Sequence, residues 1–242
     1  MLHFLNALLA DSRPKSLVTA AELAIGSLLL LTAGLLLPEV VPTSLNWIVA
    51  VGVYVGISAI VIVCWPYGAL GWANRVTLAR AVLVALVAGG LVIQAFTSAI
   101  WQWLLIAVIA LLLDGVDGWV ARFTNSHSTF GARFDMELDA LLIMLLCVGL
   151  WQIESLGLWV LMIGGTRYLF VAAGTLLPWL TAPLFPSFRR KAVCVWQVSA
   201  LLLALTPLTS PFAASLLALS ALLSLMYSFG VDMWWLYKHQ SK

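Results

Sequence analysis

Four aspartates lie close together in the sequence, between two long apolar stretches. Asp114 and Asp117 end one stretch, and Asp135 and Asp139 begin the next. A charged side chain at the centre of a membrane helix costs roughly 2.5–3.5 kcal/mol on the insertion scale, so four cost on the order of 10 kcal/mol if nothing neutralises them. Acids placed at such a cost indicate a functional site, and clustered carboxylates are the ligands that hard divalent cations prefer.

The spacing within each pair places its two carboxylates on one helix face. Side chains three or four residues apart are neighbours on a helix, and the two pairs have these spacings. The connection between the apolar stretches is short, which makes their helices antiparallel neighbours and brings both pairs to one end. Four acids gathered there repel one another, and bound Mg²⁺ or Mn²⁺ removes the repulsion. Two such ions could hold both sides of a phosphoryl displacement.

Small residues and one cation accompany the first pair. Gly115, Gly118 and Ala121 leave one side of the helix end open to a ligand or to a neighbouring helix. Arg122 follows at once, where it can hold a phosphate through two hydrogen bonds. Helix packing explains the small residues equally well by themselves, but together with the acids they favour a phosphate-bearing substrate.

The composition indicates an all-α polytopic membrane protein. Of the 242 residues, 63% are hydrophobic and only 9% are charged, whereas soluble domains carry about 25% charged residues. A membrane span needs roughly 20 apolar residues. Eight segments are candidates for membrane spans, although the seventh is short: residues 17–37, 46–65, 78–96, 99–121, 134–153, 156–177, 192–206 and 212–237.

The distribution of Lys and Arg predicts the orientation in the membrane. Both ends of the chain and the loops after the second, fourth and sixth segments carry Lys or Arg, and the alternate loops carry none. By the positive-inside rule, both termini and the aspartates are cytoplasmic. We therefore expect a multi-pass protein, with a bacterial inner membrane as its location. This interpretation counts Arg75 and Arg80 as loop residues, and Arg167, in the middle of a segment, is the exception.

The pattern around the aspartates resembles the signature of the CDP-alcohol phosphotransferases. That signature reads D-x-x-D-G-x-x-A-R, then eight residues, then G-x-x-x-D-x-x-x-D, and every position is filled between Asp114 and Asp139. Family members also carry P-N-x-x-T-x-x-R before their first core helix. Here Asn74, Thr77 and Arg80 match that second pattern, and Ala73 replaces the proline.

The resemblance implies a domain organisation and a set of site residues. Residues 70–242 would form a core of six transmembrane helices, and residues 1–69 an N-terminal extension with two more. The four aspartates would bind two Mg²⁺ or Mn²⁺ ions, and Asp139 would also be the catalytic base that activates the acceptor hydroxyl. The nucleotide site would be lined by Asn74, Thr77, Gly118, Ala121 and Arg122.

The same resemblance implies a metal-dependent enzyme of phospholipid biosynthesis. It would transfer a phosphatidyl group from a CDP-linked lipid such as CDP-diacylglycerol to an alcohol, and CMP would be released. The partners would be the CDP-lipid donor, the alcohol acceptor and membrane lipids. Family resemblance also suggests a homodimer, and no nucleic-acid partner is expected.

Basic residues in the later part of the chain predict an anionic acceptor. An arginine in mid-span, such as Arg167, must face a cavity, a partner or the bundle interior. Arg190 and Lys191 belong to a basic cluster whose segment resembles G-K-x-x-T-x-x-Q, with Lys191 and Gln197 in register. In this respect the segment resembles the branch of the family that contains the phosphatidylglycerophosphate, cardiolipin and inositol-phosphate synthases. We expect Arg167, Arg190 and Lys191 to bind an acceptor such as glycerol 3-phosphate.

Several alternatives remain open at this point. Arg167 could form an ion pair or snorkel, and the basic cluster could serve only topology and lipid contact. Inositol, serine, choline or ethanolamine are other acceptors of the family. A UbiA-like prenyltransferase also uses aspartates and Mg²⁺, but it lacks the register of Gly118, Ala121 and Arg122 with Gly131. A transporter would spread its acids along the membrane normal, whereas these acids cluster at one end.

Overall fold

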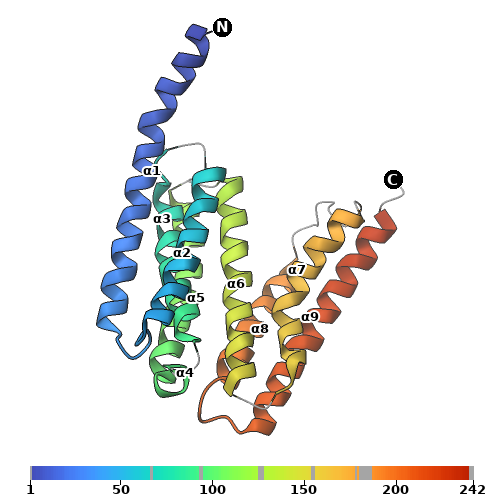
Figure 1. Cartoon of the computed structure of the whole chain (residues 1–242). Coiled ribbons are helices and arrows are strands. Elements are labelled where there is room, and N and C mark those ends of the chain that lie inside the picture. The colour runs from blue at the N-terminus through green and yellow to red at the C-terminus, as the bar shows by residue number, and fades with distance from the viewer. Residues whose placement is uncertain are drawn as a thin grey trace. The chain divides into compact units, whose positions relative to one another are not determined.

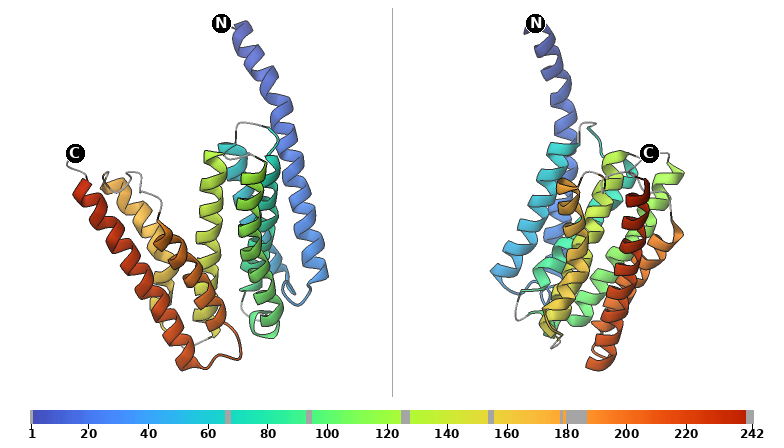
Figure 2. Two further views of the ribbon diagram at one scale, coloured as in Figure 1. Left: turned by 180° about the vertical axis from the view of Figure 1, so that it is seen from behind. Right: turned by 90° about the vertical axis from the view of Figure 1, so that its right-hand side faces the viewer.

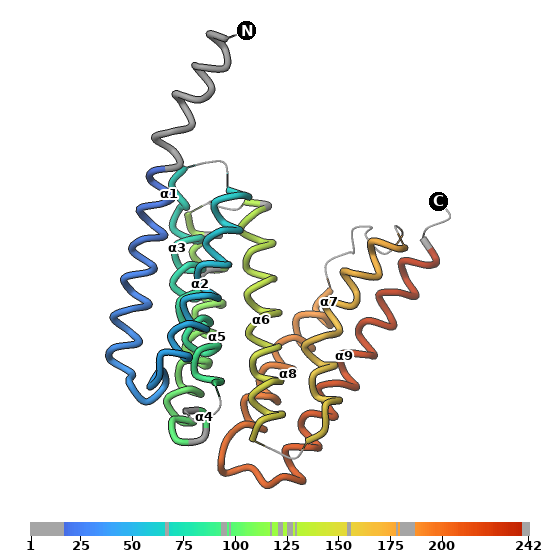
Figure 3. The backbone as a smooth tube through the Cα atoms, viewed as in Figure 1, coloured from blue at the N-terminus to red at the C-terminus, as the bar shows by residue number. Residues whose placement is uncertain are grey.

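The structure, a computed structural model, describes the backbone of residues 2–65, 68–92, 95–124, 128–153, 156–177, 179 and 187–239. Within these ranges the side chains at positions 2–16, 95, 97, 117, 121, 122, 129 and 239 are outside the described part, and Figure 3 draws the uncertain positions in grey. The described residues form helices and contain no strand. The predicted fold class is therefore confirmed.

The long helices correspond one to one to the eight predicted segments (Figure 1). Seven of them are long and apolar enough to cross a membrane, with α7 counted together with the short 3-10 helix before it, and α8, with 17 residues, is not among these seven. The protein is accordingly an integral membrane protein. The elements are α1 (Leu2–Leu36), α2 (Ser44–Cys64), α3 (Gly71–Gly90), α4 (Ala95–Ser98), α5 (Ile100–Phe123), α6 (Thr129–Ile153), η1 (Leu158–Val160), α7 (Leu161–Leu176), α8 (Phe188–Ala204) and α9 (Pro211–His239).

The third segment begins earlier than its hydropathy predicts. Helix α3 starts at Gly71, whereas the apolar run suggests a start at residue 78. The polar residues that lower the hydropathy of this first part of the helix are buried, with Asn74 4% exposed and Arg80 0% exposed. Counting Arg75 and Arg80 as loop residues was therefore wrong, because both lie within α3. A polar side chain can be buried inside a helix bundle when partners on other helices compensate it.

The chain divides into two compact units, Met1–Asp139 and Ala140–Lys242, with the division inside α6. Helix α3 is the centre of the first unit, because it packs against α1, α2 and α5. The predicted functional boundary between residues 69 and 70 is a different division, and it stays a prediction.

Hydrogen bonds fix how α2 and α5 lie along α3. Near one end of α3, the Trp103 indole donates to the Val87 carbonyl at 2.8 Å, and the Asn46 amide donates to the Gly89 carbonyl at 2.9 Å. Two glycines allow these close approaches. A Cβ added at Gly89 would lie 2.8 Å from the Asn46 carbonyl oxygen, and one at Gly90 would lie 2.6 Å from a Trp103 ring atom. Small residues let helix backbones approach closely.

Helix α1 lies beside both α2 and α3. The Tyr54 hydroxyl of α2 donates to the Leu23 carbonyl of α1 at 2.9 Å. On the α3 side, a Cβ added at Gly26 would be 3.5 Å from a methyl group of Leu78. The part of α1 around residues 22–26 is therefore next to the second turn of α3.

The second unit contains the later part of α6 with η1, α7, α8 and α9. Helix α7 packs closely on α6, because a Cβ added at Gly164 would lie 2.8 Å from the Met144 Cα. The Gln197 amide of α8 donates to the Ile163 carbonyl at 3.4 Å. Helices α8 and α9 pack along each other, as both views in Figure 2 show.

Candidate metal centre

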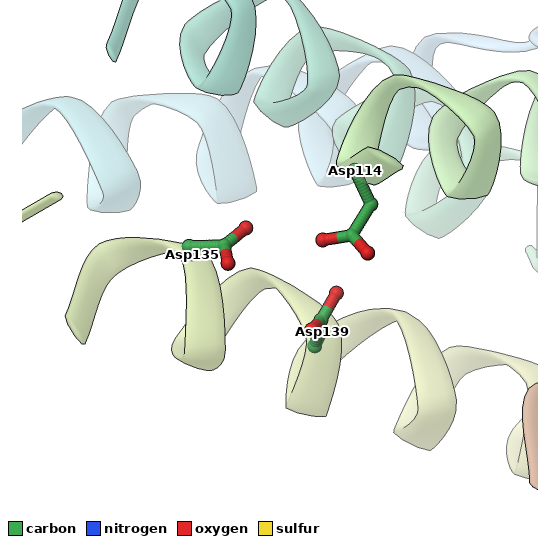
Figure 4. Close-up of side chains that lie close together, drawn as sticks. All are labelled: Asp114, Asp135 and Asp139. Carbon is green, nitrogen blue, oxygen red and sulfur yellow. The ribbon is translucent and has the colours of Figure 1, made fainter. Parts of the chain in front are cut away.

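Three of the four predicted metal ligands come together in the first unit. Asp114 extends from α5, and Asp135 and Asp139 extend from one face of α6 toward it (Figure 4). One carboxylate oxygen from each residue lies within 4.8 Å of the other two. The three side chains are half-buried, with exposed fractions of 33%, 34% and 29%. The side chain of Asp117 lies outside the described residues.

A buried arginine of α3 connects the three carboxylates. Arg80 places one guanidinium nitrogen 2.9 Å from Asp114 and pairs the same nitrogen with Asp135. Its other terminal nitrogen donates to Asp139. One side chain that is 0% exposed thus reaches acids on two other helices, and α3 sets the register of α5 and α6 at this level.

The charge of this cluster leaves room for a divalent cation. Three carboxylates contribute −3 and Arg80 contributes +1, so the described groups sum to −2. Uncompensated negative charge in a half-buried site is unfavourable. Carboxylate oxygens suit Mg²⁺ and Mn²⁺, whose opposite ligands lie about 4.2 Å apart in octahedral coordination. The three carboxylates therefore fit a divalent metal in the type of their ligand atoms, in their net charge and in the distances between their oxygens.

Arg80 is the residue whose role sequence reasoning missed. The sequence presents it only as the last position of the N-x-x-T-x-x-R pattern and as a charge near a predicted loop. One feature of the sequence could have indicated its role: Arg80 is three residues after Thr77, so the two side chains lie on the same face of a helix. A basic residue there, within an otherwise apolar run, needs an acidic partner.

Two predicted nucleotide residues lie on α3 before Arg80. Asn74 and Thr77 are 4% and 3% exposed. The Asn74 amide donates to the Leu70 carbonyl at 2.7 Å, and the Thr77 hydroxyl donates to the Ala73 carbonyl at 3.1 Å. Both hydrogen bonds run back along the helix, so they hold these side chains against the first turns of α3.

The first turn of α6 approaches Asn74 at a glycine of the signature. A Cβ added at Gly131 would lie 2.6 Å from the Asn74 side-chain oxygen and 2.9 Å from the Ser128 hydroxyl. The Ser128 hydroxyl also accepts a hydrogen bond from the Gly131 amide at 2.9 Å. Since Gly131 is next to Asn74 and Asp135 is next to Arg80, the start of α6 runs in the same direction as α3.

A comparison with protein families matches residues 70–229 to CDP-alcohol phosphatidyltransferase. That region is more than half of the chain. The chain belongs to the CDP-alcohol phosphatidyltransferase family. The resemblance inferred from the aspartates is therefore confirmed, and the arginine-linked acids, Asn74 and Thr77 all lie within the region that defines this family. Helices α1 and α2 precede the matched region.

One curated relative shares a short segment with this chain. It is a CDP-diacylglycerol–serine O-phosphatidyltransferase of Helicobacter pylori, 46% identical over 46 residues. The shared segment covers 19% of this chain and 18% of the relative, so less than a fifth of the relative's length is matched. No solved structure matches the chain.

The other predicted nucleotide residues lie on α5. Gly118 is half-buried, one turn after Asp114. The side chains of Ala121 and Arg122 lie outside the described residues. The structure therefore places Asn74 and Thr77 on the same helix as Arg80, and the roles of all five residues stay predictions.

The predicted acceptor residues all lie in the second unit. Arg167 is half-buried on α7, Arg190 is half-buried near the start of α8, and Lys191 is exposed. The neighbouring Arg189 is tied to α9. Its guanidinium donates to the Ser228 carbonyl at 2.6 Å and to the Ser228 hydroxyl at 3.1 Å.

A buried acid completes this tie between α8 and α9. Arg189 also pairs with Asp232, which is 5% exposed, and a guanidinium nitrogen of Arg190 lies 3.9 Å from the same carboxylate. Asp232 therefore compensates part of the basic cluster. With Lys191 included, three positive charges and one negative charge sum to +2, which is still suited to an anion.

Proposed function

We propose that this protein is a divalent-metal-dependent phosphatidyltransferase. It transfers the phosphatidyl group of a CDP-linked lipid, such as CDP-diacylglycerol, to an alcohol and releases CMP. The observation that carries the proposal is the set of three carboxylates around Arg80, within the region that matches the family. Asp114, Asp135 and Asp139 would hold the metal together with Asp117, and two ions would be bound.

The chain's own residues would divide the work between binding and proton transfer. Asn74, Thr77, Gly118, Ala121 and Arg122 would bind the cytidine diphosphate part of the donor. Arg80 would hold the carboxylates at one level of the bundle. When bound, the divalent ions supply positive charge that holds the phosphate oxygens and stabilises the leaving CMP.

The reaction itself needs one base and correct positioning. The acceptor oxygen forms a bond to the lipid-bearing phosphorus while the bond from that phosphorus to CMP breaks. Asp139 would accept the proton of the acceptor hydroxyl. Phosphoryl transfer depends mainly on positioning and electrostatic stabilisation, which a rigid set of charged groups can provide.

We propose an anionic acceptor of the glycerol 3-phosphate type. Arg167, Arg190 and Lys191 would bind its phosphate. Support comes from the excess of positive charge at the start of α8 after pairing with Asp232. Charge-assisted hydrogen bonds from arginine and lysine are the strong interactions by which proteins recognise phosphate.

Serine is the second candidate acceptor. The observation that favours it is the local similarity to a serine O-phosphatidyltransferase. Serine is zwitterionic, so it would make less use of a basic cluster than a phosphorylated alcohol. In that case the start of α8 would serve topology and lipid contact only.

The membrane orientation belongs to the same proposal. Both termini and the aspartates would lie on the cytoplasmic side, because the Lys and Arg residues near the ends of the spans, Arg75 in α3 included, then share one side. CDP-lipids carry a water-soluble head group, which is compatible with a site at the cytoplasmic end of the helices. A bacterial inner membrane and a homodimer are part of the expectation.

The test is a CMP-release assay with a panel of acceptors. Purified protein in mixed micelles receives CDP-diacylglycerol, Mg²⁺ or Mn²⁺, and either glycerol 3-phosphate, serine or inositol, and both CMP and the lipid product are measured. We expect CMP only with metal, and most of it with glycerol 3-phosphate. Preference for serine would replace the anionic acceptor. Full activity in excess chelator, or no CMP with any acceptor, would overturn the proposed function.

A further inference from the structure

Helix α1 carries one acid in its apolar part, and that acid contacts the start of α3. Glu22 accepts a hydrogen bond from the Leu70 amide at 2.8 Å and two from the Arg75 guanidinium, at 2.9 Å and 2.6 Å. Its side chain is only 11% exposed. An acid in a membrane span is costly and marks a specific role. Here the acid contacts the start of the helix that carries Asn74 and Thr77.

A second contact from α1 reaches the segment just before α3. The Thr19 hydroxyl, which is 4% exposed, donates to the Gly68 carbonyl at 2.6 Å, and the Trp65 indole donates to the same carbonyl at 2.8 Å. Gly68 and Gly71 have φ angles of 84° and 76°. Only glycine adopts such angles without strain, so the chain turns here in a conformation that α1 then holds.

These contacts lead directly to a predicted nucleotide residue. The Leu70 amide is bound by Glu22, and the Leu70 carbonyl accepts the hydrogen bond from Asn74. Arg75, the next residue along the chain, is held by the same carboxylate. One turn later, Gly26 of α1 lies against Leu78. Helix α1 therefore contacts α3 before, beside and after Asn74.

We propose that α1 is a positioning element of the nucleotide site, acting through Glu22 and Thr19. Its acid fixes the first turn of α3, so that Asn74 and Thr77 are held in place for the cytidine diphosphate group. This inference rests on the proposed function, in which these two residues bind the donor. It gives the N-terminal extension a role in donor affinity, although α1 lies outside the region that matches the family.

The test compares Glu22 with a matched acid of the same extension. Glu39 accepts a hydrogen bond from the Gln102 amide at 2.7 Å, at the other end of α1 and away from Leu70. Affinity for CDP is measured by calorimetry with Mn²⁺ present, and donor KM, acceptor KM and the Mn²⁺ concentration for half-activation are measured in the CMP assay. Glu22→Ala should weaken CDP binding and raise donor KM on the order of 10-fold.

The graded variants separate positioning from general damage. Glu22→Gln keeps an oxygen that can accept from the Leu70 amide, so its CDP affinity should lie between those of the wild type and Glu22→Ala. Thr19→Val should also weaken CDP binding, and Glu39→Gln should not. Acceptor KM and the Mn²⁺ requirement should stay within about 2-fold in all of them, since the carboxylates are held by Arg80.

The outcomes distinguish this inference from the proposed function. If Asn74→Ala weakens CDP binding but Glu22→Ala and Thr19→Val do not, α1 has no positioning role. If CDP, acceptor and Mn²⁺ constants all worsen together, α1 is only a general support and the inference is wrong. If wild-type protein does not bind CDP, or Asn74→Ala leaves its affinity unchanged, the nucleotide assignment itself fails and this inference fails with it.

Discussion

Replacing Arg80 by glutamine removes the one described cation among three carboxylates. Arg80 is 0% exposed, and removing one partner of a buried ion pair typically costs about 3–5 kcal/mol. The acids here are 29–34% exposed, so water screens part of their repulsion. We therefore expect the metal-free variant to lose about 2–3 kcal/mol of folding stability. For a chain of this size, Tm would fall by about 4–12 °C.

A divalent cation should reverse most of that loss. Without Arg80 the net charge of the described site residues becomes −3 instead of −2. The carboxylates then repel one another more strongly, so bound Mn²⁺ stabilises the folded protein by a larger amount. Thermal unfolding in detergent is measured in chelator and again in saturating Mn²⁺. The increase in Tm on adding Mn²⁺ should be larger for Arg80→Gln than for the wild type. Arg80→Lys, which keeps the charge but loses the planar fork, should be intermediate.

Arg75→Gln is the matched control, because Arg75 lies on the same helix but is 41% exposed and pairs with Glu22. Its Mn²⁺ increment should equal that of the wild type. Two results would refute the reasoning about Arg80. One is an unchanged Tm of Arg80→Gln in chelator, and the other is an equal Mn²⁺ increment in variant and wild type.

Four further predictions follow from the same site and topology. Asp139→Asn should abolish CMP release while CDP binding is partly retained, and measurable turnover would exclude Asp139 as the base. Gly131→Ala should cost about 1–3 kcal/mol of stability and weaken CDP binding, because the new Cβ would meet two polar side-chain oxygens, at 2.6 Å and 2.9 Å; an unchanged melting curve and CDP affinity would contradict the packing. Lys191→Ala should raise acceptor KM by about 10- to 100-fold with donor KM little changed, whereas an unaffected acceptor KM would limit the basic cluster to topology. Cysteines introduced near Glu39 and Arg189, in a background without the native cysteines, should be labelled from opposite sides of the membrane; labelling from one side would remove at least one span.

The positions of the helices and the family of the chain can be predicted from the amino-acid sequence alone. Span length and apolar composition are local properties, so seven helices long enough to cross a membrane could be located without any tertiary information. The four-residue spacing of Asp135 and Asp139 likewise fixes a shared helix face. The signature that these residues belong to is a pattern of spacings along the chain, which explains why the family could be recognised from it.

The partners of the polar residues inside the spans, in contrast, depend on how the helices pack. Arg80 pairs with acids 55 and 59 residues away, and Glu22 contacts an arginine 53 residues away. Hydropathy treats such residues as reasons to end a span, which is why α3 begins earlier than predicted. Charge counting alone also did not show that Asp232 compensates Arg189. A buried charge is stable only beside a partner on another helix, and that pairing depends on how the helices pack.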